Sequence, residues 1–283
     1  MERPTVLTHE EVLTPEHAEA FASLIDVPVP DLAADGLPLL WHWLYLSVWP
    51  AQRDIGADGH PTRGSLPVPP APGQRRMWAG GRVRTQHPLV TGRTAVRRSE
   101  VVSTTTKQGR SGPLTFVVVE HRITQDGVTC VVEEQDIVYR EAVAPDGPGP
   151  VPTPDGPAAT PAPVAVPPAA GERRVALDPP HLFRFSALTR NAHRIHYDRE
   201  YARSVEGYPA LVVHGPLQAL LMAESARAAG AVGRLTMNYR LVSPLLEHQG
   251  LVTGSEPSPH GWNVHVRDDS GRVTATGTVS NEE

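Results

Sequence analysis

The stretch GPLQALLMAESARAA, from Gly215 to Ala229, predicts a helix that is apolar on nearly every side over its first three turns. A helix without a polar face has to be buried. The following chain alternates apolar and polar residues, as in Leu235–Leu241, and Gly and Pro separate such segments. This alternation predicts half-buried strands. A twisted antiparallel sheet wrapped around one buried helix satisfies both patterns, so the predicted fold class is α+β.

The first half of the chain predicts a similar unit. Gly36-Leu-Pro38-Leu-Leu-Trp41 resembles the start of the later helix, because a glycine again opens an apolar run with proline in the first turn. We therefore expect a second buried helix there, followed by a long loop over Pro50–Arg75. The strands predicted after it are Val96–Thr105, Pro113–Ile123 and Val128–Tyr139.

Short sequence echoes indicate that the two halves are copies of one unit. Pro88-Leu89 recurs as Pro244-Leu245, and Ser99-Glu100 recurs as Ser255-Glu256. Both pairs are separated by 156 residues, so the register is kept. We interpret this as an internal duplication, although so short an echo could also arise by chance.

A proline-rich segment divides the chain. Ten prolines occur in the 24 residues from Pro145 to Pro168. Proline lacks the N–H group and fixes φ, so such a segment cannot form a helix interior or a sheet ladder, and we expect an extended linker. The predicted organisation is one unit over residues 1–141, a linker over 142–172 and a second unit over 173–283.

Composition limits the class of protein. The net charge of −5 argues against a nucleic-acid binder, which needs a basic face. The single cysteine, Cys130, excludes an intramolecular disulfide framework and fits a reducing compartment. The longest apolar stretch, Leu37–Trp49, is too short for a membrane span of about 20 residues. With no apolar run after Met1-Glu2-Arg3-Pro4, we expect a cytoplasmic protein that binds no membrane.

The densest polar cluster runs from Asn191 to Asp198, after a predicted strand over His181–Thr189. His196 can exchange protons near neutral pH, because imidazole titrates at about 6.5. Asn191 could orient a water molecule or a hydroxyl group. The N–H of Gly215 at a helix N-terminus could polarise a carbonyl group, and the missing side chain lets a ligand approach.

Other interpretations of this cluster remain open. A histidine in a loop is usually solvated or hydrogen-bonded, and Asp198 is better explained as the N-cap of a short helix over Arg199–Ser204. Three histidines also suggest zinc, but His193 and His196 share no helix and no carboxylate completes a ligand set. We therefore predict no metal. No nucleotide-binding glycine motif or nucleophile-elbow motif is present.

The stretch Phe185–Leu221 resembles the hydratase signature of the MaoC-like hot-dog proteins, which are R-specific enoyl-CoA hydratases and 3-hydroxyacyl thioester dehydratases. That pattern is an acidic residue or Asn, four residues, His, and later His-Gly at the start of the central helix. The resemblance implies that Asn191, His196 and Gly215 are the catalytic residues.

The resemblance extends to the first half of the chain. The segments Arg75–Arg82 and Glu133–Arg140 are similar to the degenerate N-terminal hot dog of the two-domain members. It implies a double hot dog with one active site, in which the first unit completes the substrate tunnel. Within the family, the sequence is most similar to the mesaconyl-C4-CoA (3-methylfumaryl-CoA) hydratases.

Many members carry Asp where this chain has Asn191, and Asn cannot take a proton. We therefore expect His196 to be the main acid and base, while Asn191 holds the water or the 3-hydroxyl group and Gly215 N–H receives the thioester oxygen. The residues expected to contact the substrate are Arg190, His193, Arg194 and His214, with Arg75, Arg76, Arg82 and Arg84 for phosphates or an acidic acyl group. Alternatively, arginines on strands simply face water.

Four hypotheses follow. The first is hydration or dehydration of the C2=C3 bond of an enoyl-CoA with a small branched or dicarboxylic acyl group. The second is dehydration of longer 3-hydroxyacyl groups on acyl-carrier protein or CoA, the third a non-catalytic acyl-thioester-binding subunit, and the fourth a thioesterase. All four need no cofactor beyond the CoA of the substrate, and they leave a homo-oligomer open.

Overall fold

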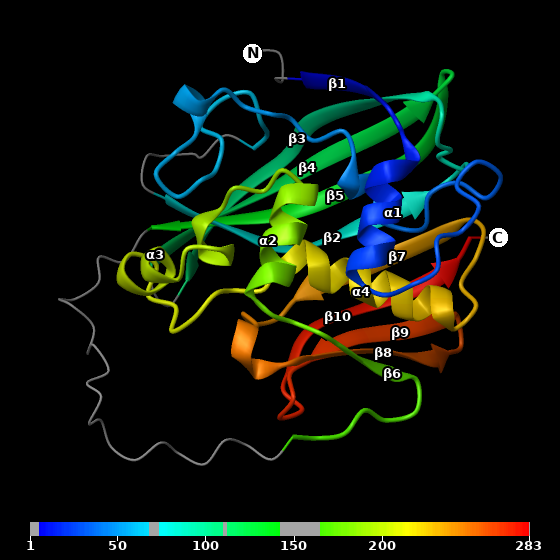
Figure 1. The fold of residues 1–283 in the computed structure, drawn as a ribbon. Helices are drawn as coiled ribbons and strands as arrows, with labels where there is room; N and C mark the ends of the chain where they lie inside the picture. The colour runs from blue at the N-terminus through cyan, green and yellow to red at the C-terminus, as the bar shows by residue number, and fades with distance from the viewer. Residues whose placement is uncertain (1–5, 68–73, 110–111, 142–164, 283) are drawn as a thin grey trace.

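The computed structural model describes residues 6–67, 74–109, 112–141 and 165–282. Ten antiparallel strands form one sheet, and the main helices lie on one side of it (Figure 1). The strand order is β1-β3-β4-β5-β2-β7-β10-β9-β8-β6. The α+β class is confirmed, and the predicted pair of sheets is joined edge to edge through β2 and β7.

The strands of the first half are β1 (Val6–Val12), β2 (Gln74–Thr85), β3 (Thr94–Gly109), β4 (Gly112–Gln125) and β5 (Val128–Glu141). Those of the second half are β6 (Glu172–Val175), β7 (Leu235–Leu241), β8 (Leu251–Ser258), β9 (Gly261–Arg267) and β10 (Val273–Asn281). The α-helices are α1 (Pro15–Leu24), α2 (Pro179–Leu188), α3 (Arg199–Ser204) and α4 (Gly215–Ala228). The short 3-10 helices are η1 (Trp41–Leu44), η2 (Gln52–Asp54), η3 (Arg194–His196) and η4 (Glu247–Gln249).

The strand order is symmetric about the junction between β2 and β7. From that junction, β5, β4, β3 and β1 follow on one side, and β10, β9, β8 and β6 follow in the same relation on the other. Arg82 lies directly opposite Asn238 in the ladder. These positions are 156 apart, which is also the spacing of the sequence echoes. The pairing therefore supports an internal duplication with a local two-fold axis at this pair.

The buried helix predicted from Gly215 is α4, which packs on β8, β9 and β10. Nine of its residues are buried, among them Leu217, Leu221 and Met222. Each buried Leu or Met contributes about 1.5–3 kcal/mol relative to an exposed one. The sheet therefore curves around a helix with apolar side chains on almost every face. No helix in the described part of the chain is both long enough and apolar enough to cross a bilayer.

The prediction of a long helix after Gly36 is wrong. The segment forms only the single turn η1, because Leu40 and Leu46 on either side of it adopt positive φ values of 69° and 57°. The segment is nevertheless buried as predicted, and Trp41 has no exposed surface. Its indole Nε1 donates a hydrogen bond to Glu224 Oε1 of α4, at 2.8 Å. The first half thus contributes the Trp41 side chain to the core, where it packs beside α4.

The strand predicted over His181–Thr189 is also wrong, because these residues belong to α2. Pro179 and Pro180 occupy its first turn, and the Asp178 side chain accepts a hydrogen bond from His181 N at 2.7 Å. The buried residues Leu182, Phe185 and Ser186 recur every three or four positions, which is the helical period.

Most of the predicted linker, residues 142–164, lies outside the described residues, so the division into 1–141, 142–172 and 173–283 stays a prediction. The end of that segment does pack on the second half. Val166 N donates to Asp269 O at 2.7 Å, and Arg267 donates to the Pro167 carbonyl oxygen at 3.0 Å. Hydrogen bonds to the second half therefore hold Val166 and Pro167, which precede β6, in place.

Replacing Trp41 tests its contact with the central helix. Trp41→Phe removes the hydrogen bond to buried Glu224 and leaves a small cavity, so we expect the free energy of unfolding to fall by about 2–3 kcal/mol. Urea denaturation followed by circular dichroism measures this. Trp49→Phe is the matched control, because Trp49 is 73% exposed and its loss should change stability by about 0.5 kcal/mol or less. Equal effects of the two substitutions would contradict the assigned role.

Candidate active site at the start of the central helix

The candidate site lies where the loop between α2 and α3 meets the N-terminus of α4. A loop of the first half, residues 51–67, packs against it: Arg194 N donates to Asp58 O at 2.9 Å. Gly59 has a φ of +93°, and a Cβ at this position would lie 1.8 Å from the Ala192 carbonyl oxygen. Only glycine allows this close approach. Both halves of the chain therefore build the site.

The His196 ring is fixed in one tautomer. Its Nδ1 donates to the Val212 carbonyl oxygen at 2.7 Å, so in the neutral ring Nε2 carries the lone pair. Nε2 has no hydrogen-bond partner within the described residues. The side chain is 6% exposed, and this burial lowers the pKa of His196 to about 4. His196 is therefore a neutral base near pH 7.

The His214 ring packs against the His196 ring. The two imidazoles stack with centroids 3.6 Å apart and planes 20° apart. The Ser186 hydroxyl lies 2.8 Å from His214 Nε2, and burial holds the pKa of His214 well below its usual value. His214 has no exposed surface, and its contact with substrate stays a prediction. The stacked His214 ring limits the positions that the His196 ring can take.

Gly215 follows His214 directly and is the first residue of α4. Its amide has no acceptor within the helix, as is general for the first turn. A Cβ on Gly215 would lie 2.3 Å from Leu241 Cδ1, so a larger residue here would have to displace the end of the Leu241 side chain on β7. Because Val212 and His214 both hold the His196 ring, the imidazole and the Gly215 amide lie at the same end of α4.

Asn191 lies in the loop between α2 and α3. Its Oδ1 accepts a hydrogen bond from His193 N at 3.0 Å, and its own N–H donates to Ser186 O at 2.8 Å. These bonds fix the turn that follows α2. The side chain is partly exposed, and its Nδ2 has no partner among the described residues. The amide group is therefore free to donate to a bound molecule.

His193 belongs to a second cluster that the sequence did not reveal. Its ring lies 4.1 Å from the His60 ring and 5.4 Å from the His196 ring, measured between centroids. His60 Nδ1 and Asp58 Oδ2 are 3.0 Å apart. Asp58 and His60 come from the predicted long loop, 133 residues or more before His193, and no spacing rule connects them.

The pKa values in this cluster are strongly displaced. Burial, assisted by the nearby His60, lowers the pKa of His193 to about 2. Burial alone would raise the pKa of Asp58, but the hydrogen bond and charge of His60 bring it down to about 2. Asp58, His60 and His193 offer ligand atoms within 4.8 Å of one another and are the described residues that could hold a metal ion. This set corrects the expectation that no carboxylate completes a histidine cluster.

Three of the predicted substrate-binding arginines are occupied by internal contacts. Arg194 binds the Asp198 carboxylate at 2.7 Å and stacks on Tyr201. Arg190 donates to Ser47 O, and Arg75 forms an ion pair with Glu206 at 3.1 Å. These residues hold the loop around the site, which the sequence did not distinguish from substrate contacts. Asp198 caps α3 as predicted by accepting from Tyr201 N at 3.0 Å.

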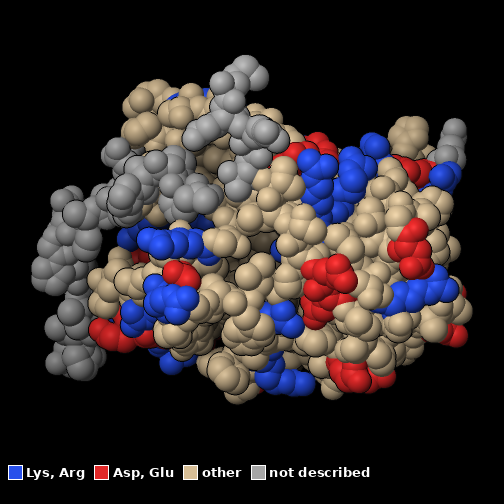
Figure 2. All heavy atoms as spheres, turned by 90° about the horizontal axis from the view of Figure 1, so that it is seen from above, with Lys and Arg blue, Asp and Glu red and all other residues tan. Residues whose placement is uncertain are grey.

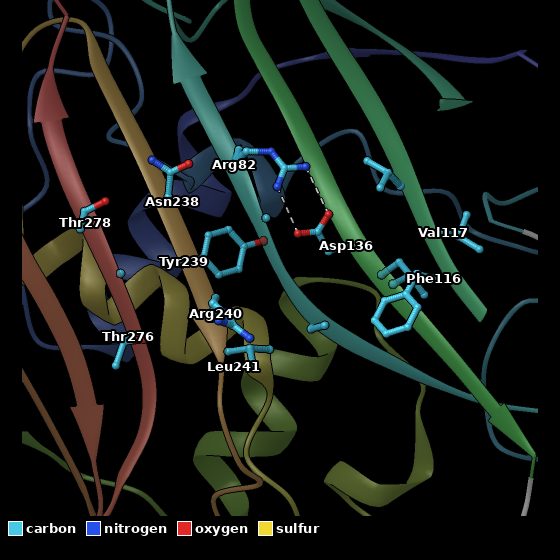
Figure 3. Close-up of a pocket in the computed structure, with 15 residues that line it drawn as sticks. Arg82, Phe116, Val117, Asp136, Asn238, Tyr239, Arg240, Leu241, Thr276 and Thr278 are labelled. Atoms are coloured by element: carbon cyan, nitrogen blue, oxygen red, sulfur yellow. Dashed lines mark hydrogen bonds and ion pairs between the residues drawn. The ribbon is translucent and has the colours of Figure 1, made fainter. Parts of the chain in front are cut away.

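Arg82 and Arg84 lie on the opposite face of the sheet from the core, so the structure does not bring them together with the histidines, and their contact with substrate stays a prediction. Both alternate along β2 with Val83, whose side chain is in the core, so they face the other side of the sheet. Arg82 binds Glu134 and Asp136, and Arg84 binds Glu282 at 2.6 Å. Figure 3 shows Arg82 pointing toward Asp136 with the helices behind the sheet.

The groove in Figure 3 has a volume of about 760 Å³ and crosses β4, β5, β2, β7 and β10. None of the site histidines lines it. On the face seen from above in Figure 2, groups of Lys and Arg side chains lie beside groups of Asp and Glu side chains. This groove is therefore separate from the candidate site at the start of α4.

A double hot-dog sheet with a neutral buried histidine near the start of its central helix is the arrangement that the resemblance to acyl-thioester hydratases and dehydratases implied. A family model for hydroxyacyl-thioester dehydratase type 2 matches residues 40–247, and the chain belongs to this family. It is 43% identical over 265 residues to mesaconyl-C4-CoA hydratase of Chloroflexus aurantiacus, covering 93% of this chain and 90% of that protein. The protein is thus a hydro-lyase, as the resemblance implied.

Solved structures confirm the fold. HtdX of Mycobacterium tuberculosis matches with a TM-score of 0.69 at 15% identity, covering 98% of this chain and all of that one. A MaoC-like dehydratase of Phytophthora capsici matches with a TM-score of 0.70 at 15% identity, covering 99% and 95%. A Mycobacterium tuberculosis protein described as a double hotdog matches with a TM-score of 0.52 at 16% identity, covering 99% and 96%.

The lowered pKa of His196 predicts a specific pH dependence of stability. The unfolded chain binds a proton below about 6.5 whereas the folded chain binds it only near pH 4, so unfolding becomes easier as the pH falls through this window. Between pH 6 and pH 5, His196→Gln should lose about 1 kcal/mol less unfolding free energy than the unsubstituted protein. Urea titrations at several pH values measure this. Parallel profiles would show that His196 is not held neutral by the fold.

Proposed function

We propose that this protein hydrates mesaconyl-C4-CoA (3-methylfumaryl-CoA) at its C2=C3 bond. The observation that carries the proposal is the buried His196 ring, with Nδ1 tied to Val212 O and Nε2 available, at the N-terminal end of α4. The substrate assignment is supported by the 43% identity to the mesaconyl-C4-CoA hydratase over nearly the whole chain.

His196 acts as both base and acid in this proposal. Its Nε2 takes a proton from water while the water oxygen bonds to C3, and the double-bond electrons move toward the thioester to give an enolate. The proton then passes from Nε2 to C2 and restores the thioester carbonyl. The low pKa of His196 keeps the ring unprotonated at neutral pH, so it is ready to accept the first proton.

Two neutral groups assist. The Gly215 amide donates to the thioester oxygen, where negative charge develops, and one such donor contributes about 3–4 kcal/mol to the transition state. The Asn191 amide orients the attacking water. Asn replaces the carboxylate common in the family, so it positions the water and does not exchange protons with it.

The reverse reaction on a 3-hydroxyacyl thioester is the second candidate function. It is favoured by the family description and by 41% identity over 73 residues to the mitochondrial hydroxyacyl-thioester dehydratase type 2 of Schizosaccharomyces pombe, which covers 25% of this chain and 24% of that protein. The same residues would remove the C2 proton and release water. For either direction we propose a cytoplasmic location, consistent with the single cysteine.

The central test is replacement of the acid-base residue. His196→Ala should lower the rate of mesaconyl-C4-CoA hydration by about 1000-fold or more, because no other group replaces its proton transfers. Asn191→Ala should retain measurable activity with a rate lower by roughly 10- to 100-fold. Loss of the conjugated thioester absorbance follows the reaction, and free thiol is measured in parallel.

Three results would contradict this assignment. Full turnover by the folded His196→Ala variant would place the acid-base residue elsewhere. Release of free thiol at the rate of absorbance loss would indicate thioester hydrolysis instead. Turnover restricted to long-chain 3-hydroxyacyl thioesters would favour the second candidate.

The proposed chemistry needs no cofactor beyond the CoA of the substrate. Chelation tests this, because Asp58, His60 and His193 could hold a metal ion. Extended dialysis against EDTA should change the hydration rate by less than about 2-fold, and added Zn²⁺ should not raise it. A large loss that Zn²⁺ restores would require a metal-dependent mechanism.

A further inference from the structure

Arg76 differs from the other arginines proposed to contact substrate. Arg75, Arg82 and Arg84 each form an ion pair with a carboxylate. Arg76 forms no hydrogen bond or ion pair within the described residues. It is partly buried, and this burial lowers the pKa of Arg76. The charge of Asp58 offsets part of this effect, but no carboxylate of the described residues contacts the guanidinium group. Arg76 therefore offers N–H donors and a positive charge to an anionic ligand.

Arg76 faces the interior side of the sheet. It lies directly opposite Tyr139 in the ladder between β2 and β5, and directly opposed residues share one face. The Tyr139 side chain is fully buried and donates to the Pro67 carbonyl oxygen at 3.1 Å, in the loop that covers the site. Arg76 therefore lies on the side of the sheet that carries this loop, opposite to the face of Arg82.

The histidines connect this side to the reacting centre. His196, His193 and His60 form a continuous row of rings, with centroid separations of 5.4 Å and 4.1 Å. The charge of Arg76 acts on His193 and on Asp58. Asp58 is already bound to His60, so no carboxylate of the described residues is in direct contact with the guanidinium group.

The proposed substrate supplies a suitable anion. In 3-methylfumaryl-CoA the carbon that receives the hydroxyl group also carries a methyl group and a free carboxylate. A receptor for that carboxylate has to lie beside the acid-base histidine. We propose that Arg76 binds the free carboxylate of a dicarboxylic acyl group, and so selects such substrates over neutral enoyl groups. This inference rests on the proposed function and extends it to the choice of acyl group.

Competing ligands are less favourable here. A metal ion on Asp58, His60 and His193 would be repelled by the charge of Arg76. A phosphate of CoA would have to sit next to the reacting carbon, although the thioester end of CoA is what reaches that carbon. A carboxylate matches the two parallel N–H donors of a guanidinium group.

Binding of unreactive analogues tests the inference independently of catalysis. Succinyl-CoA and butyryl-CoA differ only by a carboxylate in place of a methyl group. Isothermal titration should show that the unsubstituted protein binds succinyl-CoA roughly 10- to 100-fold more tightly, and that Arg76→Met abolishes this preference. Arg84→Met is the matched control, because it removes the same charge from the opposite face and should keep the preference.

Kinetics provide the second measurement. Arg76→Met should lower kcat/KM for mesaconyl-C4-CoA roughly 10- to 100-fold while crotonyl-CoA, which lacks the carboxylate, stays within about 3-fold. Retained crotonyl-CoA turnover also shows that the variant folds. A carboxylate preference that is absent from the unsubstituted protein, or that persists in Arg76→Met, would overturn the inference. Failure of the unsubstituted protein to hydrate either compound would instead reject the proposed function, and the binding comparison would still decide the role of Arg76.

Discussion

The hydrogen bond from His196 Nδ1 to the Val212 carbonyl oxygen, 2.7 Å long, is the contact on which the proposed active site depends. It joins the loop after α2 to the segment that enters α4, and it sets which ring nitrogen is available for chemistry. The stacked His214 ring adds a second support from the residue that precedes Gly215. The His196 ring, which is the proposed acid-base group, and the Gly215 amide, which is the proposed donor, are therefore both positioned by residues 212–215.

The first half of the chain contributes to the site without repeating it. Where the second half has α4, the first half has only η1, whose Trp41 reaches across to Glu224. Its long loop then covers the catalytic segment, and Gly59 permits direct backbone contact with Ala192. Arg76 enters the interior from β2. The first half thus contributes a loop and a strand to the proposed acyl site, and the second half contributes the central helix.

Local sequence patterns predicted elements well where burial followed a regular period. The strands of both halves and α4 are such cases, since an alternating or fully apolar pattern allows one buried arrangement. The pattern failed at Gly36, where an apolar run resembles a helix but positive φ values at Leu40 and Leu46 limit it to one turn. It failed again over His181–Thr189, where two prolines and an N-cap at Asp178 start a helix.

The sequence by itself determined the fold class and the motif from Asn191 to Gly215, because both depend on residues close together in the chain. Only the tertiary structure decided which charged groups surround that motif. Asp58 and His60 reach it from a distant loop, and Arg76 differs from Arg82 by the face of β2 that it occupies. A bulge between Trp78 and Gly80 changes the strand alternation between these arginines. Contacts and strand faces of this kind are set by long-range packing, which no local spacing of residues encodes.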